Sequence, residues 1–168
     1  GGVGGLGGSS AQPSLGGHVV GRFVGYPFPT SSVGVEFSAR EGYINRDERA
    51  LGAIGVEARW QRANGAFLRG GFAHHHETPL DLAVSHPLET LAASLSGIRH
   101  RSGLEAGAGW DIGFHDPYIG DRFGLLFDLS VAVFPDDNGP AAYVFLEQSF
   151  TFDVGKSRRP PAETVVEP

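Results

Sequence analysis

The stretch IRHRSGLEAGAGWDIGFH, residues 98 to 115, determines which kind of sheet this chain builds. Every second residue from Leu104 to Phe114 is apolar, whereas every second residue from Arg101 to Asp111 is charged or glycine. Side chains of a β-strand point alternately to its two faces. We therefore predict one long strand that has a bulky apolar face and a second face of small residues and long charged side chains.

Two architectures accommodate such a strand. In a soluble barrel or sandwich the apolar face points inward and the polar face meets water. In a membrane barrel the apolar face meets lipid, and charged side chains fill a narrow interior where glycine leaves room for them. A water-exposed strand surface is seldom rich in glycine and usually carries lysine, yet the only lysine here is Lys156. The pattern therefore favours the membrane barrel.

The composition bounds the domain count and the fold class. The 168 residues, of which 40% are hydrophobic, make one domain with a substantial buried or lipid-covered surface. The 26 glycines, the 12 phenylalanines and many short alternating runs favour an all-β fold. No apolar run approaches the roughly 18 residues that a membrane helix requires. Any span across a membrane must therefore belong to a closed β-barrel.

Residue content also excludes several classes of function. The sequence has no cysteine, which rules out a disulfide framework and a zinc-thiolate site. The formal net charge of -6 and the lack of a basic cluster in the body of the chain argue against nucleic acid as a partner. The sequence opens at Gly1 without a recognisable signal peptide, which fits a mature form whose export signal has been removed.

The division between an apolar and a charged face recurs along the chain. Besides residues 98–115 we predict strands at residues 18–26, 32–41, 53–60, 66–74, 123–134 and 141–154. The dipeptide Asn64-Gly65 indicates a tight hairpin between two of them. Residues 75–97 form a long connection with a predicted short helix, which has Ser85 as its N-cap and Gly97 as its terminator. The apolar face of this helix would be Leu88, Leu91 and Leu95.

A closed barrel of antiparallel neighbours needs an even number of strands, so the glycine-rich residues 1–8 are the candidate for an eighth strand. The expected connections then alternate between longer ones (9–16, 43–49, 76–99 and 135–140) and shorter ones (27–31, 63–65 and 115–121). Short turns on one side and long loops on the other are typical of outer-membrane barrels, whose short turns are periplasmic. We therefore expect an antiparallel up-and-down transmembrane β-barrel over residues 1–154, both termini in the periplasm, and a disordered tail over residues 155–168.

By this pattern residues 1–154 resemble the small eight-stranded outer-membrane β-barrels of Gram-negative bacteria. The resemblance implies a bacterial outer-membrane location and contact with outer-membrane lipid and lipopolysaccharide. Another protein is a further expected partner, bound through the outer loops or the C-terminal tail. The chain differs from such barrels at its end, because they usually finish on an aromatic residue and here a tail follows Phe152.

The charged residues on the small-residue face form the first candidate site. In a barrel they would share the lumen, where charges are tolerable only when they are paired and hydrogen-bonded. The predicted lumen network consists of Arg22, Arg40, Arg59, Arg69, Arg101, Glu36, Glu57, Glu105, Asp111, Asp128 and Glu147. Asp153 lies on the same face. We expect a packed polar plug rather than a pore or a proton path, because an eight-stranded barrel is too narrow to conduct.

The histidines form the second candidate site. Under the expected topology the long-loop rim carries His18, His74, His75, His76, His86 and His100, together with Asp136 and Asp137, whereas His115 falls at the opposite end. Neutral imidazole binds zinc, copper and nickel. The candidate ligands of a divalent transition metal, the one cofactor that we consider, are therefore His74, His75, His76 and His100. Two alternatives stay open, a pH-dependent switch or solvated loop histidines of which successive residues point to opposite faces.

A third constellation, His100-Arg101-Ser102, lies at a predicted strand end. Residues two apart share a face, so the imidazole and the hydroxyl could act as base and nucleophile on the lipid-facing side. This arrangement is similar to the His-x-Ser pair of the outer-membrane lipid A deacylase, an eight-stranded barrel whose site faces the outer leaflet. The resemblance implies a lipid-directed hydrolase, for which Glu77 would supply the acid from the loop. The following Asn of that family is replaced by Gly103, and Glu105 has the opposite parity.

We predict from these patterns a non-enzymatic protein with a structural or interaction role. The first alternative is the hydrolase that uses His100 and Ser102. The second alternative is a soluble lipocalin-like carrier with an internal pocket lined by Phe37, Trp60, Trp110 and Phe127.

Overall fold

The structure is a computed structural model of the chain. It describes residues 2–8, 11–28, 31–44, 48–86, 97–116, 120–135 and 140–154. Within these ranges it describes the side chains of all residues except 2–8, 11–15, 115–116 and 120–122. The predicted disordered tail, residues 155–168, lies outside the described part of the chain.

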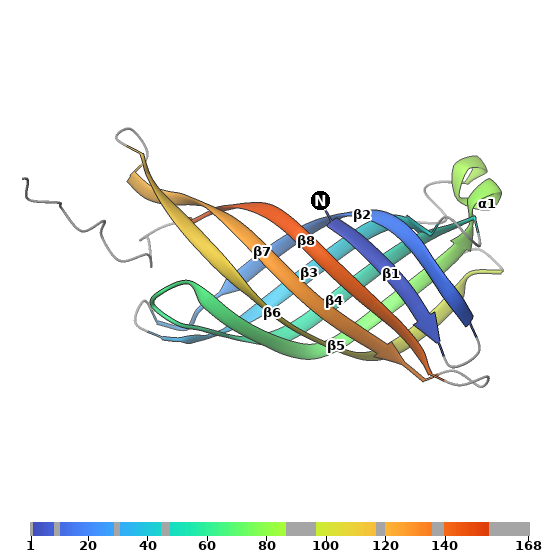
Figure 1. The fold of residues 1–168 in the computed structure, drawn as a ribbon, viewed down its shortest axis with the longest axis horizontal. Coiled ribbons are helices and arrows are strands. Elements are labelled where there is room, and N and C mark those ends of the chain that lie inside the picture. The colour runs from blue at the N-terminus through green and yellow to red at the C-terminus, as the bar shows by residue number, and fades with distance from the viewer. Residues whose placement is uncertain are drawn as a thin grey trace, which may run out of the picture.

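The described chain forms a closed antiparallel barrel (Figure 1). Its elements in chain order are β1 (Gly2–Gly8), β2 (Ala11–Gly25), β3 (Val33–Ile44), β4 (Arg49–Gln61), β5 (Ala66–Pro79), α1 (Leu80–Ser85), β6 (Arg99–Asp116), β7 (Gly120–Phe134) and β8 (Ala141–Phe152). Each strand pairs with the next one in the sequence, and β1 pairs with β8, which closes the sheet. The prediction of an all-β, up-and-down antiparallel barrel with one short helix is confirmed.

The strands run obliquely along the barrel, and α1 lies at one end of it (Figure 1). We call this the α1 end. The opposite end carries the β4–β5 connection, which we call the hairpin end. Here Gly65 has a φ of 85° and its N–H donates to the carbonyl oxygen of Arg62 at 3.0 Å, so the predicted hairpin at Asn64-Gly65 is confirmed.

The two faces of the sheet separate apolar from charged side chains. Along β3 burial alternates residue by residue, with Val35 and Phe37 exposed outside and Glu36 buried inside. Along β6 the outward Leu104 is 70% exposed, whereas the next residue, Glu105, is 2% exposed. The period of two in the sequence therefore sorts side chains between the outside and the lumen, as expected for strands.

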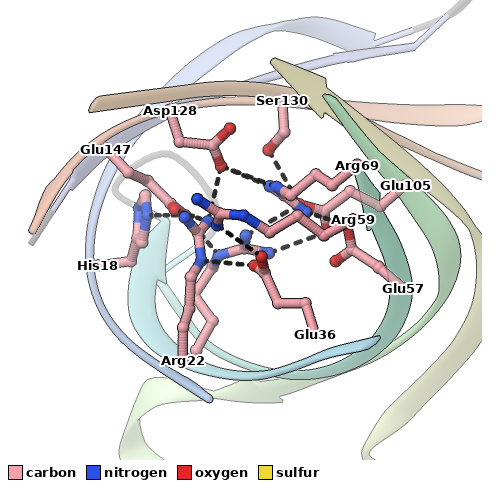
Figure 2. A network of polar contacts seen from close by, with 11 residues as sticks. His18, Arg22, Glu36, Glu57, Arg59, Arg69, Glu105, Asp128, Ser130 and Glu147 are labelled. Carbon is pink, nitrogen blue, oxygen red and sulfur yellow. Dashed lines mark hydrogen bonds and ion pairs between the residues drawn. The ribbon is translucent and has the colours of Figure 1, made fainter. Parts of the chain in front are cut away.

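The lumen is filled in three layers. At the α1 end an apolar cluster closes it, made of Ile44, Leu51, Ala73, Ala132, Phe134, Tyr143 and Phe145. Charged side chains fill the middle (Figure 2). Toward the hairpin end Phe67 and Leu126 are buried at 2% and 3% exposure, near the starts of β5 and β7. The charges are thus enclosed between apolar side chains.

Some sequence predictions about the elements are wrong. Most of the expected connection 9–16 belongs to β2, which already begins at Ala11, because these residues pair with β1, and Gly16 pairs with β3 as well. The helix α1 precedes the predicted one and ends at Ser85, whose hydroxyl donates to the carbonyl oxygen of Asp81 at 2.8 Å, whereas the predicted helix between Ser85 and Gly97 lies mostly outside the described residues. The predicted helix face of Leu88, Leu91 and Leu95 lies outside the described residues.

In the described part of the chain, no helix is long and apolar enough to cross a membrane.

The predicted internal pocket of a soluble carrier is also wrong. Its four lining residues lie on the outside, with exposed fractions of 51% for Phe37, 42% for Trp60, 51% for Trp110 and 40% for Phe127. Their parity is that of the outer face, so their rings cannot reach the lumen.

Several inward-facing glycines are required by the close approach of neighbouring backbone. An ideal Cβ at Gly103 would overlap the carbonyl oxygen of Val133 and lie 2.8 Å from Cδ1 of Phe134. At the outward-facing Gly21, nothing lies within 4 Å of the same position. Packing against neighbouring atoms therefore requires glycine at position 103, whereas position 21 has room for a larger side chain.

We predict that Gly103→Ala lowers the free energy of unfolding by about 1–3 kcal/mol, the usual cost of overpacking a closed interior. Gly21→Ala is the matched control and should change the stability by less than about 0.5 kcal/mol. Urea unfolding followed by circular dichroism measures both variants. Equal midpoints for the two would contradict the close approach at Gly103.

Candidate functional site

The middle layer of the lumen is one connected network of charged side chains (Figure 2). Its arginines and carboxylates come from seven different strands: Arg22, Glu36, Arg40, Glu57, Arg59, Arg69, Glu105, Asp128 and Glu147. Each of these carboxylate side chains is at most 1% exposed. We call these nine residues the lumen network.

Arg69 lies at the centre of the network and bonds to three carboxylates. Its Nη2 donates to Asp128 Oδ2 at 2.6 Å and to Glu105 Oε1 at 2.7 Å, and its Nη1 donates to Glu57. Its Nε donates to Asp128 Oδ2 at 3.0 Å. The guanidinium therefore compensates the charge of carboxylates on β4, β6 and β7 at the same time.

Arg40 binds Glu105 in bidentate geometry and joins it to Glu147. Its Nη1 and Nη2 donate to the two oxygens of Glu105 at 3.1 and 2.9 Å, and its Nε donates to Glu147 Oε1 at 2.8 Å. The guanidinium carbon lies 4.1 Å from the ring centre of Phe145, one of the residues of the apolar cluster. Paired hydrogen bonds of this kind fix direction as well as charge.

Arg22 connects the two sides of the network. Its Nη2 donates to Asp128 Oδ2 at 2.7 Å and also contacts Glu147. Its Nε lies 3.2 Å from Glu36 Oε1 in an ion pair whose angle does not allow a hydrogen bond. Arg59 then donates to the other oxygen of Glu36 at 2.9 Å.

The two remaining members of the predicted lumen set lie away from the lumen network. Arg101 Nη1 donates to Glu77 Oε1 at 2.5 Å and to the Tyr143 hydroxyl at 2.9 Å, next to the apolar cluster of the α1 end. Asp111 accepts a hydrogen bond from the Thr151 hydroxyl at 3.0 Å and lies toward the hairpin end. The structure thus brings nine of the eleven predicted residues into one network and gives the other two separate partners.

The placement of His18 differs from the prediction of a rim histidine. It is 8% exposed in the lumen, and its Nε2 lies 2.8 Å from Glu147 Oε1 (Figure 2). Its ring also packs edge-on against Phe145 at 5.2 Å between centroids. His18 therefore extends the lumen network instead of the rim.

The apolar side chains that enclose the network were not predicted from the sequence. Phe67 covers the guanidinium of Arg59 at 3.7 Å from its ring centre, toward the hairpin end. At the α1 end Phe134, Tyr143 and Phe145 pack over the charges. The sequence signal that could have found them is their parity. Each is separated by an even number of residues from a lumen charge on its own strand, and therefore lies on the same face.

A second cluster lies on the outer wall near the α1 end. His74 and His76 of β5 and His100 of β6 each offer one ring nitrogen, and the three nitrogens lie within 4.8 Å of one another. His76 is paired with His100 across the two strands, and His74 with Ser102. His74 Nδ1 lies 2.7 Å from the Ser102 hydroxyl oxygen. We call His74, His76 and His100 the histidine cluster.

The histidine cluster lies beyond the apolar outer band, which ends at Phe72 on β5 and Leu104 on β6. Partial burial lowers the pKa of His76, and the neighbouring imidazoles of His74 and His100 lower it further. Both causes favour the neutral ring, which is the form that binds a metal ion.

The predicted metal ligands are thereby corrected in two ways. His75 points inward, is 0% exposed and packs on Phe134 at 4.1 Å between ring centroids, so it belongs to the interior. The other three lie on strands and not in a loop, because β5 extends to Pro79 and β6 begins at Arg99. His86 is exposed after α1, and the side chain of His115 and residues Asp136 and Asp137 lie outside the described part.

The predicted hydrolase residues do not come together. Ser102 is exposed on the outer face, where its hydroxyl bonds to His74 rather than to His100. Glu77 is 3% exposed inside the barrel, where Arg101 and Tyr143 donate to it. The wall of the barrel separates this carboxylate from Ser102 and His100, so Glu77 cannot serve as their acid.

Comparisons of the chain with protein-family models, with curated proteins and with solved structures found no match.

We predict that Arg69→Met lowers the free energy of unfolding by about 3–5 kcal/mol, because it leaves buried carboxylates without their shared counter-charge. Arg62→Met is the matched control, since Arg62 is exposed and its guanidinium lies 5.9 Å from the ring of Trp60. The control should cost no more than about 1 kcal/mol. Urea unfolding followed by circular dichroism compares them, and similar losses for both would argue against an enclosed network.

Proposed function

We propose that this chain is an eight-stranded transmembrane barrel of a bacterial outer membrane. In this proposal it does not conduct, and it has a structural or interaction role. The observation that carries the proposal is the polarity of the two faces, with large apolar side chains exposed outside and charged ones buried inside. A barrel in water has the opposite arrangement, because the hydrophobic effect drives apolar side chains into the interior.

The outer face supports a lipid environment over a continuous band. On β7 every second residue from Phe123 to Val133 is apolar and faces outward, and Leu129 among them is 54% exposed. This run matches the roughly 9–11 residues that a tilted strand needs to cross a bilayer. Exposed apolar side chains on β3, β4, β5, β6 and β8 continue the band, and a continuous apolar surface of this kind marks contact with a membrane or a partner.

Aromatic side chains on the outer face gather toward the hairpin end. Trp60 lies at the end of β4, and Trp110 and Phe114 lie in the second half of β6. The indole N–H of Trp110 donates to the carbonyl oxygen of Asn64 at 3.0 Å. Such rings are typical of the interface between lipid and water. They support a position of the hairpin end at one membrane surface.

The interior supports a structural role rather than transport. The lumen network occupies the middle of the barrel, and buried apolar side chains lie on both sides of it. Each arginine of the network is held by at least one carboxylate, so moving one aside would leave a buried charge unpaired. We therefore propose that the barrel interacts with its surroundings through lipid and lipopolysaccharide, and with another protein through its outer loops or tail.

We expect the chain, expressed with an export signal, to partition with outer membranes and to migrate differently on a detergent gel before and after heating. The folded barrel resists detergent until heat unfolds it, which produces the shift. A freely soluble monomer without a heat shift would overturn the membrane proposal.

A charged substitution in the outer band distinguishes a lipid environment from water more directly. Leu129→Arg should destabilise a membrane barrel by about 2–4 kcal/mol, because the guanidinium faces lipid near mid-depth. Val154→Arg is the control, because Val154 is 89% exposed beyond the end of β8. In water the Leu129 variant would be close to neutral. The measurement is the urea midpoint in lipid vesicles, and equal midpoints for the two variants would contradict the proposal.

We further expect no stepwise conductance when the purified barrel is inserted into a planar lipid bilayer. Among the described residues the lumen network and the apolar side chains on both sides of it fill the interior, and an eight-stranded barrel has an interior just wide enough for its side chains. Heat-dependent migration after extraction verifies that the barrel was incorporated. Discrete conductance steps from such a barrel would refute the sealed lumen but would leave the proposed membrane location intact.

A further inference from the structure

We propose that His74, His76 and His100 form a binding site for one divalent transition metal ion, Zn²⁺, Cu²⁺ or Ni²⁺, on the outer wall of the barrel. The site goes beyond the proposed structural role. Its ligands depend on the pairing of β5 with β6 and not on whether lipid or water surrounds the band below them.

The spacing of the three rings fits a mononuclear site. In a tetrahedral zinc site with Zn–N distances of about 2.0–2.1 Å, neighbouring nitrogens are about 3.3 Å apart. Here the three nitrogens lie within 4.8 Å of one another, and the ring centroids of His76 and His100 are 4.6 Å apart. Side-chain rotation can close the difference of about 1.5 Å, while the paired strands hold the Cα atoms in place.

The hydrogen bond between His74 and Ser102 supplies the outer support that metal-binding histidines usually have. A histidine ligand commonly donates its second ring N–H to a neighbouring group, which fixes the tautomer and the ring orientation. His74 Nδ1 and the Ser102 hydroxyl oxygen are 2.7 Å apart, and the two residues are directly paired. With Nδ1 donating to Ser102, Nε2 carries the lone pair that binds the metal.

The surface beside the cluster carries a negative charge. Glu41 of β3, Gly52 of β4, His76 and His100 follow one another along a single row of the strand pairing. Gly52 has no side chain, and Glu41 Oε1 lies 3.4 Å from the position of an ideal Cβ at Gly52. The carboxylate therefore leans over β4, on the side of β3 that faces the cluster. A negative charge at this place favours a bound cation.

Three imidazole ligands leave one position of a tetrahedral site open. Zinc sites with three protein ligands keep that position for water or a substrate oxygen. Below the site, toward the hairpin end, the outer band begins at Phe72 and Leu104.

The test uses protein without a histidine tag, folded in detergent and titrated calorimetrically with ZnCl₂, NiCl₂ or CuSO₄. We expect one ion per chain and tighter binding of Cu²⁺ than of Zn²⁺ or Ni²⁺, as imidazole sites generally show. Replacing His74, His76 and His100 together by Gln should abolish binding. His86→Gln is the matched control, since His86 is exposed near the same end outside the cluster, and it should leave the isotherm unchanged.

A second pair of variants tests the surroundings of the ligands. Ser102→Ala should weaken binding about 10- to 100-fold, as loss of the outer support of a ligand usually does. Glu41→Gln should weaken it by a smaller factor, because Glu41 acts only through its charge. Both side chains lie on the outer face, so circular dichroism should show an unchanged fold.

Binding that persists in the triple Gln variant, or no binding by the parent protein, would overturn the site. If the triple variant does not fold, electron paramagnetic resonance of the parent with Cu²⁺ decides instead. Coupling to several imidazole nitrogens is expected, and its reduction in His100→Gln supports the assignment, whereas identical spectra refute it. A soluble barrel that still binds the ion would remove the membrane proposal and retain the metal site.

Discussion

The need to pair every charge inside a closed lumen is the constraint on which the rest of this structure depends. The lumen network draws its residues from β2 to β8, so its ion pairs form only when these strands occupy neighbouring places around the barrel. Arg69 alone requires carboxylates from β4, β6 and β7. A slip of one residue in any of these strands would turn its charged side chains outward. The network therefore specifies strand register, whatever its net contribution to stability.

Glycine supplies the space that this pairing requires. An ideal Cβ at Gly107 would lie 3.0 Å from Arg69 Nε and 3.0 Å from Asp128 Oδ1. At Gly55 it would lie 3.1 Å from Glu57 Oε1. A larger residue at either place would push apart groups that must stay in contact. Glycine and charged residues therefore alternate along the inner faces for one reason. The long charged side chains fill the volume that the neighbouring glycines leave free.

Residue alternation predicted the fold and sorted the side chains between the two faces, because both properties repeat within a single strand. It did not predict contacts between strands, which depend on register. The sequence suggested His100 as the partner of Ser102, whereas cross-strand pairing gives that place to His74. The sequence places Glu77 in a loop because nothing local marks the extension of β5 to Pro79. The inward position of His75 followed from parity alone and could have been predicted once residues 74–76 were treated as strand.

The three successive histidines of β5 face alternately outward and inward, so one strand contributes both to the lumen and to the outer cluster. His75 packs against Phe134 and Tyr143 and helps to close the lumen at the α1 end. His74 and His76 face outward, where β6 brings His100 beside them. Strand pairing holds both arrangements, because the backbone that positions the interior ring also positions the exterior ones. The packed interior therefore gives the outer cluster a rigid platform, and a ligand bound there would link β5 to β6.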